Sequence, residues 1–140
     1  MKKVLVTGGN GHLGYNLCKT LSERGYHVRA TVRSESAASV LKSLANVETC
    51  IADIRDLAAI KNCLADIEGI FHSAAPNLPW SANPEKEIVE PIVDGTKNVL
   101  KAAGEAKIKR VIFTSSCSTI GMNATVDQPL TEDQGFNTES

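Results

Sequence analysis

Short runs of apolar residues, many of them β-branched, alternate along the chain with longer segments that mix apolar and polar positions. The apolar runs predict strands at five places: residues 3–7, 27–32, 47–52, 69–73 and 110–115. The longer segments predict four helices: residues 12–24, 35–45, 57–65 and 84–107. Because strands that alternate with helices are typical of βαβ units, the pattern predicts an α/β fold with a doubly wound parallel sheet.

Several features of the pattern indicate the topology. Gly25 follows the first helix as a C-terminal cap, and Asn83 and Pro84 supply an N-cap and a first helical residue for the last helix. Right-handed crossovers and a glycine-rich turn after the first strand favour strand order 3-2-1-4-5, with a ligand crevice between the first and fourth strands. The last helix is expected to bury one face, made of Ile88, Ile92, Val99, Leu100 and Ala103.

The turn after the first strand reads Thr7-Gly8-Gly9-Asn10-Gly11-His12-Leu13-Gly14. It satisfies both the G-x-G-x-x-G and the T-G-x-x-G-x-x-G spacing, and it lies between a strand and a helix, which is the context that such a motif requires. Gly8 provides the tight turn, Gly11 a close backbone approach to a pyrophosphate, and Gly14 close packing of the helix on the sheet. The backbone N–H groups of residues 10–13 then point at the phosphates. The sequence therefore predicts a Rossmann-type dinucleotide site that includes Gly8, Asn10, Gly11, His12, Leu13 and Gly14.

The end of the second strand indicates which dinucleotide is bound. Proteins of this architecture that use NAD place an acidic residue there, about 20 residues after the glycines, to bind the ribose 2′-hydroxyl. Residues 28–34 contain no acidic residue and two arginines. Because the Arg33 guanidinium matches the geometry of a 2′-phosphate, we expect NADP(H) as the cofactor. The alternative is that Arg33, and more readily Arg29, is a solvated charge at the strand end.

Asp53 and Ile54 come directly after the third strand. At that position the Asp53 carboxylate and the Ile54 backbone N–H are expected to contact the adenine edge. A loop aspartate that caps the next helix near Asp56 would look the same in the sequence, so the cofactor contact and the helix cap remain alternatives.

Composition and charge narrow the class of protein. The chain has 140 residues, 42% of them hydrophobic, and a net charge of −1, without the clustered basic run typical of nucleic acid binding. No apolar stretch approaches the length of a membrane span. The four cysteines lack the C-x-x-C spacing of zinc and redox sites, so no metal site is predicted. They are interpreted as small buried apolar residues, with a disulfide or metal role as the alternative, and we expect a reduced, cytoplasmic protein.

Four segments, in this order, give the chain a specific resemblance: residues 4–14, 28–33, 69–76 and 110–116. Over residues 3–135 the chain resembles the extended short-chain dehydrogenase/reductase family, of NAD-dependent epimerase/dehydratase type, and most closely its dihydroflavonol-reductase-like and cinnamoyl-CoA-reductase-like members. The resemblance implies cofactor contacts from Ala74 and Ala75 beside the nicotinamide ribose. It also implies a catalytic serine at Ser116, which binds the substrate carbonyl or hydroxyl. From the residues alone, Ser115, Ser116 and Ser118 are not distinguished.

The chain departs from this family at the proton donor. The family uses the tyrosine of a Tyr-x-x-x-Lys pair downstream of the serine, whereas Tyr15 and Tyr26, the only tyrosines here, lie upstream. Tyr15 and Lys19 fit the spacing, but they lie on the first predicted helix, and we interpret the match as coincidence. We expect residues 1–120 to form the cofactor-binding domain and residues 121–140 to form a polar, loop-like tail at the start of a missing C-terminal half.

The resemblance implies an NADP(H)-dependent oxidoreductase that reduces a ketone or an aldehyde, present here as an incomplete catalytic unit. Two other functions stay open. One is a non-catalytic module that senses NADP(H) or binds a partner, and the other is a fragment of a nucleotide-sugar epimerase or dehydratase. An unpaired sheet edge beside the fifth strand would favour a homodimer or pairing with the missing C-terminal segment.

Overall fold

The five predicted strands form one parallel sheet of order β3-β2-β1-β4-β5. The computed structural model describes residues 2–76, 78, 80–120, 127, 129–131 and 133, so most of the predicted tail at residues 121–140 lies outside the described residues. The strands are β1 (Lys3–Thr7), β2 (His27–Val32), β3 (Val47–Ile51), β4 (Gly69–His72) and β5 (Arg110–Phe113). The predicted strand order and the Rossmann-type fold class are confirmed.

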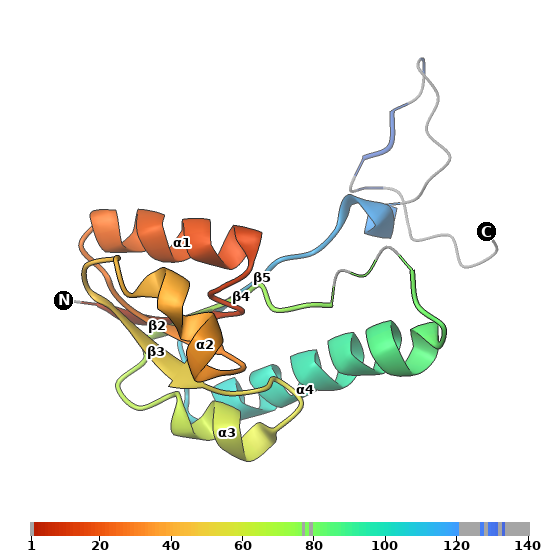
Figure 1. The fold of residues 1–140 in the computed structure, drawn as a ribbon. Coiled ribbons are helices and arrows are strands. Elements are labelled where there is room, and N and C mark those ends of the chain that lie inside the picture. The colour runs from red at the N-terminus through yellow and green to blue at the C-terminus, as the bar shows by residue number, and fades with distance from the viewer. Residues whose placement is uncertain are drawn as a thin grey trace.

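Helices cover both faces of this sheet (Figure 1). One face carries α1 and α2, and the other carries α3 and α4 (Figure 1). The helices are α1 (His12–Glu23), α2 (Glu35–Ala38), α3 (Leu57–Asn62) and α4 (Glu90–Glu105). Three shorter helical turns accompany them: η1 (Ser39–Leu41), η2 (Glu85–Val89) and η3 (Cys117–Ile120).

Each face of the sheet has its own hydrophobic core. Beneath α1 and α2, alternate residues of β1 and β2 pack against residues such as Cys18 and Leu41. On the other face, Leu5 and Ile70 from the sheet pack against Ile60 of α3 and Val99 of α4. Because both faces are covered, the central strands read as nearly continuous apolar runs, as expected for a parallel sheet.

The second and third helices are shorter than the sequence predicts. α2 ends at Ala38 and continues only as the turn η1, whereas the prediction extended to residue 45. Ser39 donates from its hydroxyl to the Ser36 carbonyl at 2.8 Å, a local bond that competes with helix continuation. α3 ends at Asn62 instead of residue 65, and Asp66 then adopts φ 63°, which closes the turn into β4.

The last predicted helix is two segments. η2 is a π-helical turn, and α4 begins behind it with Pro91 in its first turn. Because proline has no backbone N–H, it interrupts the helical ladder at that point. Of the predicted buried face, Val99 and Ala103 are buried, but Leu100 is 50% exposed.

Besides Leu100, apolar residues of the edge strand β5 are exposed. Ile112 and Phe113 of β5 are 41% and 49% exposed, although residues 111–113 form an apolar run. Within the described residues the sheet ends at β5, so no further strand covers that side.

Helix α1 packs unusually close to the turn that precedes it. Gly25 ends the helix at φ 80°, as predicted for a C-terminal cap. At the other end, a Cβ on Gly14 would lie 2.1 Å from the Gly8 carbonyl oxygen and 3.0 Å from the Gly9 Cα. The backbone of this turn therefore fills the space that a side chain would need.

Gly14→Ala is expected to lower the free energy of unfolding by about 1 to 3 kcal/mol, because the helix must move away from the turn to admit the methyl group. Gly104→Ala on α4 is the matched control, since a Cβ there meets nothing within 4 Å. That change should raise stability by about 0.5 to 1 kcal/mol through helix propensity. Urea unfolding of both variants is the measurement. Equal effects of the two substitutions would contradict the close packing at Gly14.

Candidate functional site

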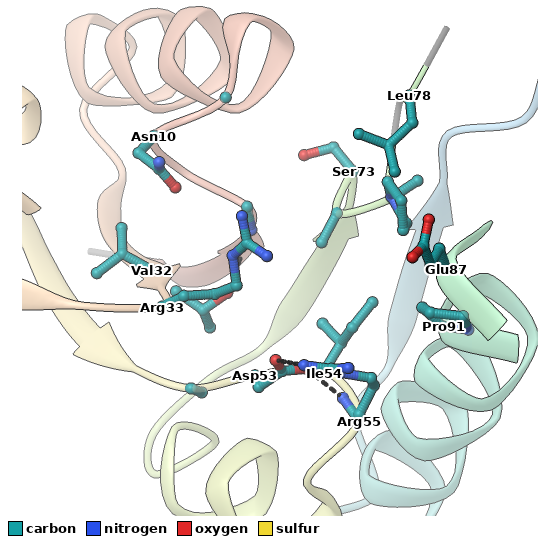
Figure 2. Close-up of a pocket in the computed structure, with 17 residues that line it drawn as sticks. Asn10, Val32, Arg33, Asp53, Ile54, Arg55, Ser73, Leu78, Glu87 and Pro91 are labelled. Carbon is teal, nitrogen blue, oxygen red and sulfur yellow. Dashed lines mark hydrogen bonds and ion pairs between the residues drawn. The ribbon is translucent and has the colours of Figure 1, made fainter. Parts of the chain in front are cut away.

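A pocket of about 470 Å³ opens at the carboxyl edge of the sheet, where the turn after β1 meets the loops that follow β2, β3 and β4. The start of the η2 and α4 segment forms the remaining wall. Figure 2 shows the arrangement, with Arg33 and Asn10 on one side, Asp53 and Arg55 below, and Glu87 and Pro91 opposite. A crevice next to the central strand β1 is where the topology predicts a ligand.

Most of the predicted cofactor-binding residues meet in this pocket. The residues that line it are Gly8, Asn10, Gly11, Arg33, Asp53, Ile54, Ala74 and Ala75. Three predicted residues do not line it. His12 and Leu13 are exposed at the start of α1, and Gly14 is buried beneath the turn.

The backbone of the glycine turn is fixed by β2. Gly8 adopts φ 70°, and its N–H donates to the Thr31 hydroxyl at 3.2 Å. The N–H of Gly9 donates to the Thr31 carbonyl at 2.9 Å. α1 then begins after Gly11, which offers no side chain to cap the helix. The first N–H groups of the helix therefore keep their capacity to bind an anion, strengthened by the helix dipole.

The charged residues that line the pocket are two arginines, Arg33 and Arg55, and two carboxylates, Asp53 and Glu87. Arg33 extends from the end of β2 into the pocket (Figure 2). Asp53 accepts two side-chain hydrogen bonds from Arg55, at 2.9 and 2.7 Å, and one from the Arg55 backbone N–H. The hydrogen bond from Arg55 and, to a smaller extent, the charge of Arg33 lower the pKa of Asp53. Asp53 is therefore a paired carboxylate, and Arg33 supplies positive charge to the pocket.

The helix-cap alternative for Asp53 is wrong. Asp56 is the N-cap of α3, and its carboxylate accepts from the backbone N–H groups of Ala58 and Ala59 at 2.9 and 3.1 Å. Asp53 instead lies in the loop between β3 and α3, with its carboxylate at the pocket.

Sequence reasoning missed several residues of the pocket. Arg55 stands two positions after Asp53, in the same loop after β3, and this position was the available signal that Arg55 belongs to the pocket. Glu87 and Pro91 also line the pocket, and no sequence signal places them there. Their position depends on how η2 and α4 pack against the sheet.

The predicted catalytic serine does not line this pocket. Ser116 lies in the exposed segment after β5, where its hydroxyl donates to Ser118 at 3.2 Å and accepts from the Ser118 backbone N–H at 3.2 Å. Tyr15, which matches the Tyr-x-x-x-Lys spacing, is on α1 and packs against the core beneath that helix. The structure thus separates Ser116 and Tyr15 from the cofactor-side residues.

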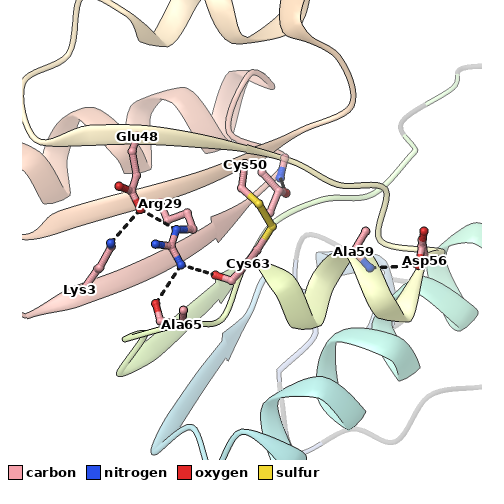
Figure 3. The surroundings of a disulfide bond; sticks show 10 residues. Lys3, Arg29, Glu48, Cys50, Asp56, Ala59, Cys63 and Ala65 are labelled. Atoms are coloured by element: carbon pink, nitrogen blue, oxygen red, sulfur yellow. Dashed lines mark hydrogen bonds and ion pairs between the residues drawn. A yellow bond between two sulfur atoms is a disulfide. The ribbon is translucent and has the colours of Figure 1, made fainter.

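A disulfide joins β3 to the end of α3 (Figure 3). It links Cys50 and Cys63, whose Cα atoms are 6.2 Å apart. The interpretation of these two cysteines as unpaired is therefore wrong, because the topology brings together residues that no motif spacing connects. The cysteines therefore no longer support the predicted reduced environment. Cys18 is buried and free, and burial raises the pKa of its thiol to about 12, whereas Cys117 is exposed.

Arg29 stabilises the same region and is not a solvated charge. Its side chain donates to Glu48 at 2.6 Å and to the carbonyls of Cys63 and Ala65, each at 2.9 Å (Figure 3). Lys3 also pairs with Glu48 at 2.8 Å. Of the two arginines at β2, only Arg33 is thus available to the pocket.

Comparisons with known proteins agree with the sequence and the fold. The model of the NAD dependent epimerase/dehydratase family matches residues 4–140. Cinnamoyl-CoA reductase 2 of Medicago truncatula is 38% identical over 139 residues, which cover 95% of this chain and 40% of the relative. Dihydroflavonol 4-reductase of Dianthus caryophyllus is 37% identical over 129 residues, which cover 87% of this chain and 36% of the relative.

Solved structures give the same result. A short-chain dehydrogenase/reductase superfamily protein from Agrobacterium tumefaciens, with bound NAD, superposes with a TM-score of 0.80 at 25% identity, covering 99% of this chain and 40% of the other. The chain therefore spans 36% to 40% of the length of these three proteins. The resemblance inferred from the four sequence segments is confirmed.

Among the described residues, no helix is both long enough and apolar enough to cross a membrane.

Reduction of the Cys50–Cys63 disulfide is expected to lower the free energy of unfolding by about 3 kcal/mol, because the bond closes a loop of sequence separation 13. Urea unfolding with and without dithiothreitol measures this, and mass spectrometry verifies the redox state. The double variant Cys50→Ala/Cys63→Ala should unfold at the same urea concentration with and without dithiothreitol. An unchanged unfolding midpoint in the fully reduced protein would contradict a stabilising role.

Proposed function

The chain belongs to the NAD-dependent epimerase/dehydratase family, and from this we propose that it is the NADP(H)-binding part of an oxidoreductase that reduces a ketone or an aldehyde. The family binds NAD(P), and the pocket has the parts that a dinucleotide needs. We assign the preference for NADP(H) over NAD(H) to Arg33. This residue lines the pocket at the end of β2, the position at which this fold recognises the 2′ group of the ribose.

The residues divide along the pocket by the part of the dinucleotide that they would hold. The glycine turn and the first N–H groups of α1 bind the pyrophosphate. Ile54 and Asp53 contact the adenine, while Ala74 and Ala75 line the nicotinamide ribose at the opposite side. This assignment follows the strand order, because the loops after β2 and β3 lie on one side of β1 and the loop after β4 on the other.

The electrostatics favour the phosphorylated cofactor. Both oxygens of the Asp53 carboxylate are bonded to Arg55, which offsets the repulsion that this carboxylate would exert on a 2′-phosphate. Among the described residues no hydrogen bond or ion pair engages the Arg33 side chain, which can therefore pair with the phosphate through two parallel hydrogen bonds. No acidic side chain occurs at residues 28–34 to bind the unmodified 2′-hydroxyl of NAD.

The reaction class comes from the relatives, whose names are those of reductases. The bound dinucleotide supplies the hydride. Ser116 orients the substrate carbonyl by donating a hydrogen bond, which requires the segment after β5 to turn toward the mouth of the pocket. The exposed outer side of β5 is where a second copy of the chain, or the remaining length of a larger protein, would pair with the sheet.

A non-catalytic NADP(H)-sensing module is the second candidate. The observation that favours it is that Ser116 is exposed and absent from the pocket lining, while the cofactor-side residues are assembled. An activity measurement separates the two candidates.

Arg33→Ala is expected to weaken NADPH binding by roughly tenfold to hundredfold and to leave NADH binding nearly unchanged, because a charge-assisted contact to the 2′-phosphate is lost. Calorimetric titration of both cofactors measures the effect. Arg24→Ala, which removes the same charge from an exposed position at the end of α1, is the control and should change neither affinity. Equal affinities of the unmodified protein for NADPH and NADH would refute the assignment of Arg33.

The chain is expected to bind NADPH yet to reduce ketones and aldehydes poorly. A general acid typically contributes about 10² to 10⁴ in rate, and the tyrosine that would serve is absent after residue 26. NADPH oxidation with a panel of carbonyl compounds is the assay, and Ser116→Ala is the control. Strong turnover that Ser116→Ala abolishes would show that the catalytic unit is complete and would exclude the sensing module.

A further inference from the structure

Three polar side chains from three different elements form a buried chain next to the pocket. His72, at the end of β4, is 1% exposed. Its Nδ1 lies 2.8 Å from the hydroxyl of Thr7 on β1, and its Nε2 lies 3.2 Å from the hydroxyl of Thr96 on α4. The ring of Phe113 on β5 lies beside it at a centroid distance of 5.5 Å. Buried polar groups of this kind act through the hydrogen bonds that they hold.

The pattern of donors determines the protonation of His72. The Thr7 hydroxyl oxygen accepts from the backbone N–H groups of Ser73 and Ala74, each at 3.1 Å. These two bonds use both of its acceptor sites, so its own hydrogen must be donated to His72 Nδ1. Nδ1 is therefore a bare acceptor, and the hydrogen on Nε2 is donated to Thr96. His72 is the neutral tautomer with the proton on Nε2.

This chain controls the shape of the pocket wall. Ser73 and Ala74 line the pocket, and the Ser73 hydroxyl also donates to the Thr7 carbonyl at 2.7 Å. Ala74 in turn packs against the glycine turn, because a Cβ on Gly8 would lie 3.0 Å from the Ala74 Cα. The Thr7 hydroxyl thus joins the loop after β4 to the turn after β1, and His72 orients that hydroxyl.

We propose that His72 is a positioning residue for the cofactor. As an uncharged acceptor it holds the Thr7 hydroxyl in the orientation that fixes Ser73 and Ala74 against the glycine turn. The affinity for the dinucleotide therefore depends on the proton state of His72. The inference rests on the proposed function, because it takes this pocket to be the dinucleotide site. His72 is therefore not the proton donor of the reaction, since both ring nitrogens are bonded inside the fold.

Protonation would break the arrangement. A proton on Nδ1 would turn that nitrogen into a donor toward the Thr7 oxygen, which already accepts two hydrogen bonds. Thr7 would have to release Ser73 or Ala74. Among the described residues, the side chains that hydrogen-bond to His72 or stack on its ring are Thr7 of β1, Thr96 of α4 and Phe113 of β5, and none of them is charged.

The sign of the pH dependence follows from burial. Desolvation of the charged form lowers the pKa of His72 below its ordinary value of about 6.5. At neutral pH the residue is uncharged, and the hydrogen-bonded chain is complete. As the pH falls below about 6.5 and through the lowered pKa, the folded protein must take up a proton at His72, so both stability and cofactor affinity are lost on the acidic side.

The test compares the affinity for NADP⁺ of the unmodified protein and of His72→Asn between about pH 5 and pH 8, by calorimetry. The Asn side-chain oxygen takes the place of Nδ1 as an acceptor but does not titrate. The 2′-phosphate of NADP⁺ titrates near pH 6 by about the same amount in both titrations, as a phosphoester does. We therefore expect the unmodified protein to lose about tenfold more affinity than His72→Asn at the acidic end, the effect of one lost hydrogen bond.

Two further variants separate positioning from simple structural damage. His72→Leu removes the acceptor and should weaken NADP⁺ binding by about tenfold at pH 8 as well. Thr96→Val removes only the partner of Nε2 and should keep the pH profile of the unmodified protein. Superimposable pH profiles for the unmodified protein and His72→Asn would overturn the proposal, as would unchanged affinity in His72→Leu.

A second measurement needs no variant and no cofactor. Nitrogen NMR of the unmodified protein should show the tautomer with the proton on Nε2, and the Ser73 and Ala74 amides should shift as the ring titrates. A proton on Nδ1 at neutral pH would overturn the proposal. Failure to bind either NADP⁺ or NAD⁺ at any pH would instead refute the proposed function, while the spectra would still report on the hydrogen-bonded chain.

Discussion

The backbone of Gly14 lies directly against the carbonyl of Gly8, and a Cβ at that point would stand 2.1 Å from the oxygen. This contact sets the distance between α1 and the sheet, and with it the direction in which the first N–H groups of the helix point. The turn is held from the other side by Thr31, which binds the N–H groups of Gly8 and Gly9. These short contacts support the anion site that we propose at the central strand.

Around this turn the pocket combines fixed backbone with a small set of charges. Asp53 and Arg55 neutralise one another, and because the Arg55 side chain is exposed the pair is a weak contributor to stability. Its importance lies in the local field, because in the proposed cofactor assignment the pairing of Asp53 with Arg55 leaves Arg33 to contact the 2′-phosphate. Arg29 lies within β2, opposite Glu48 of β3, and has a different role: its side chain binds the end of α3.

The two edges of the sheet differ in how well other elements cover them. On the β3 side, the disulfide and the Arg29 contacts join the edge strand to α3. On the β5 side, Ile112 and Phe113 remain exposed. The chain spans 36% to 40% of the length of the three proteins compared with it.

The sequence alone determined the strands, their order and the glycine turn, because periodicity, handedness and glycine spacing act over short stretches of chain. It also placed Arg33 at the end of β2. Only the tertiary structure decided that Asp53 pairs with Arg55, that Cys50 meets Cys63, and that Thr7, His72 and Thr96 form one chain. The two cysteines and the members of the hydrogen-bonded chain lie on different elements, and the distances between them depend on how helices pack on the sheet, which no local pattern of residues specifies. Asp53 and Arg55 share one loop, and the conformation of that loop sets their pairing.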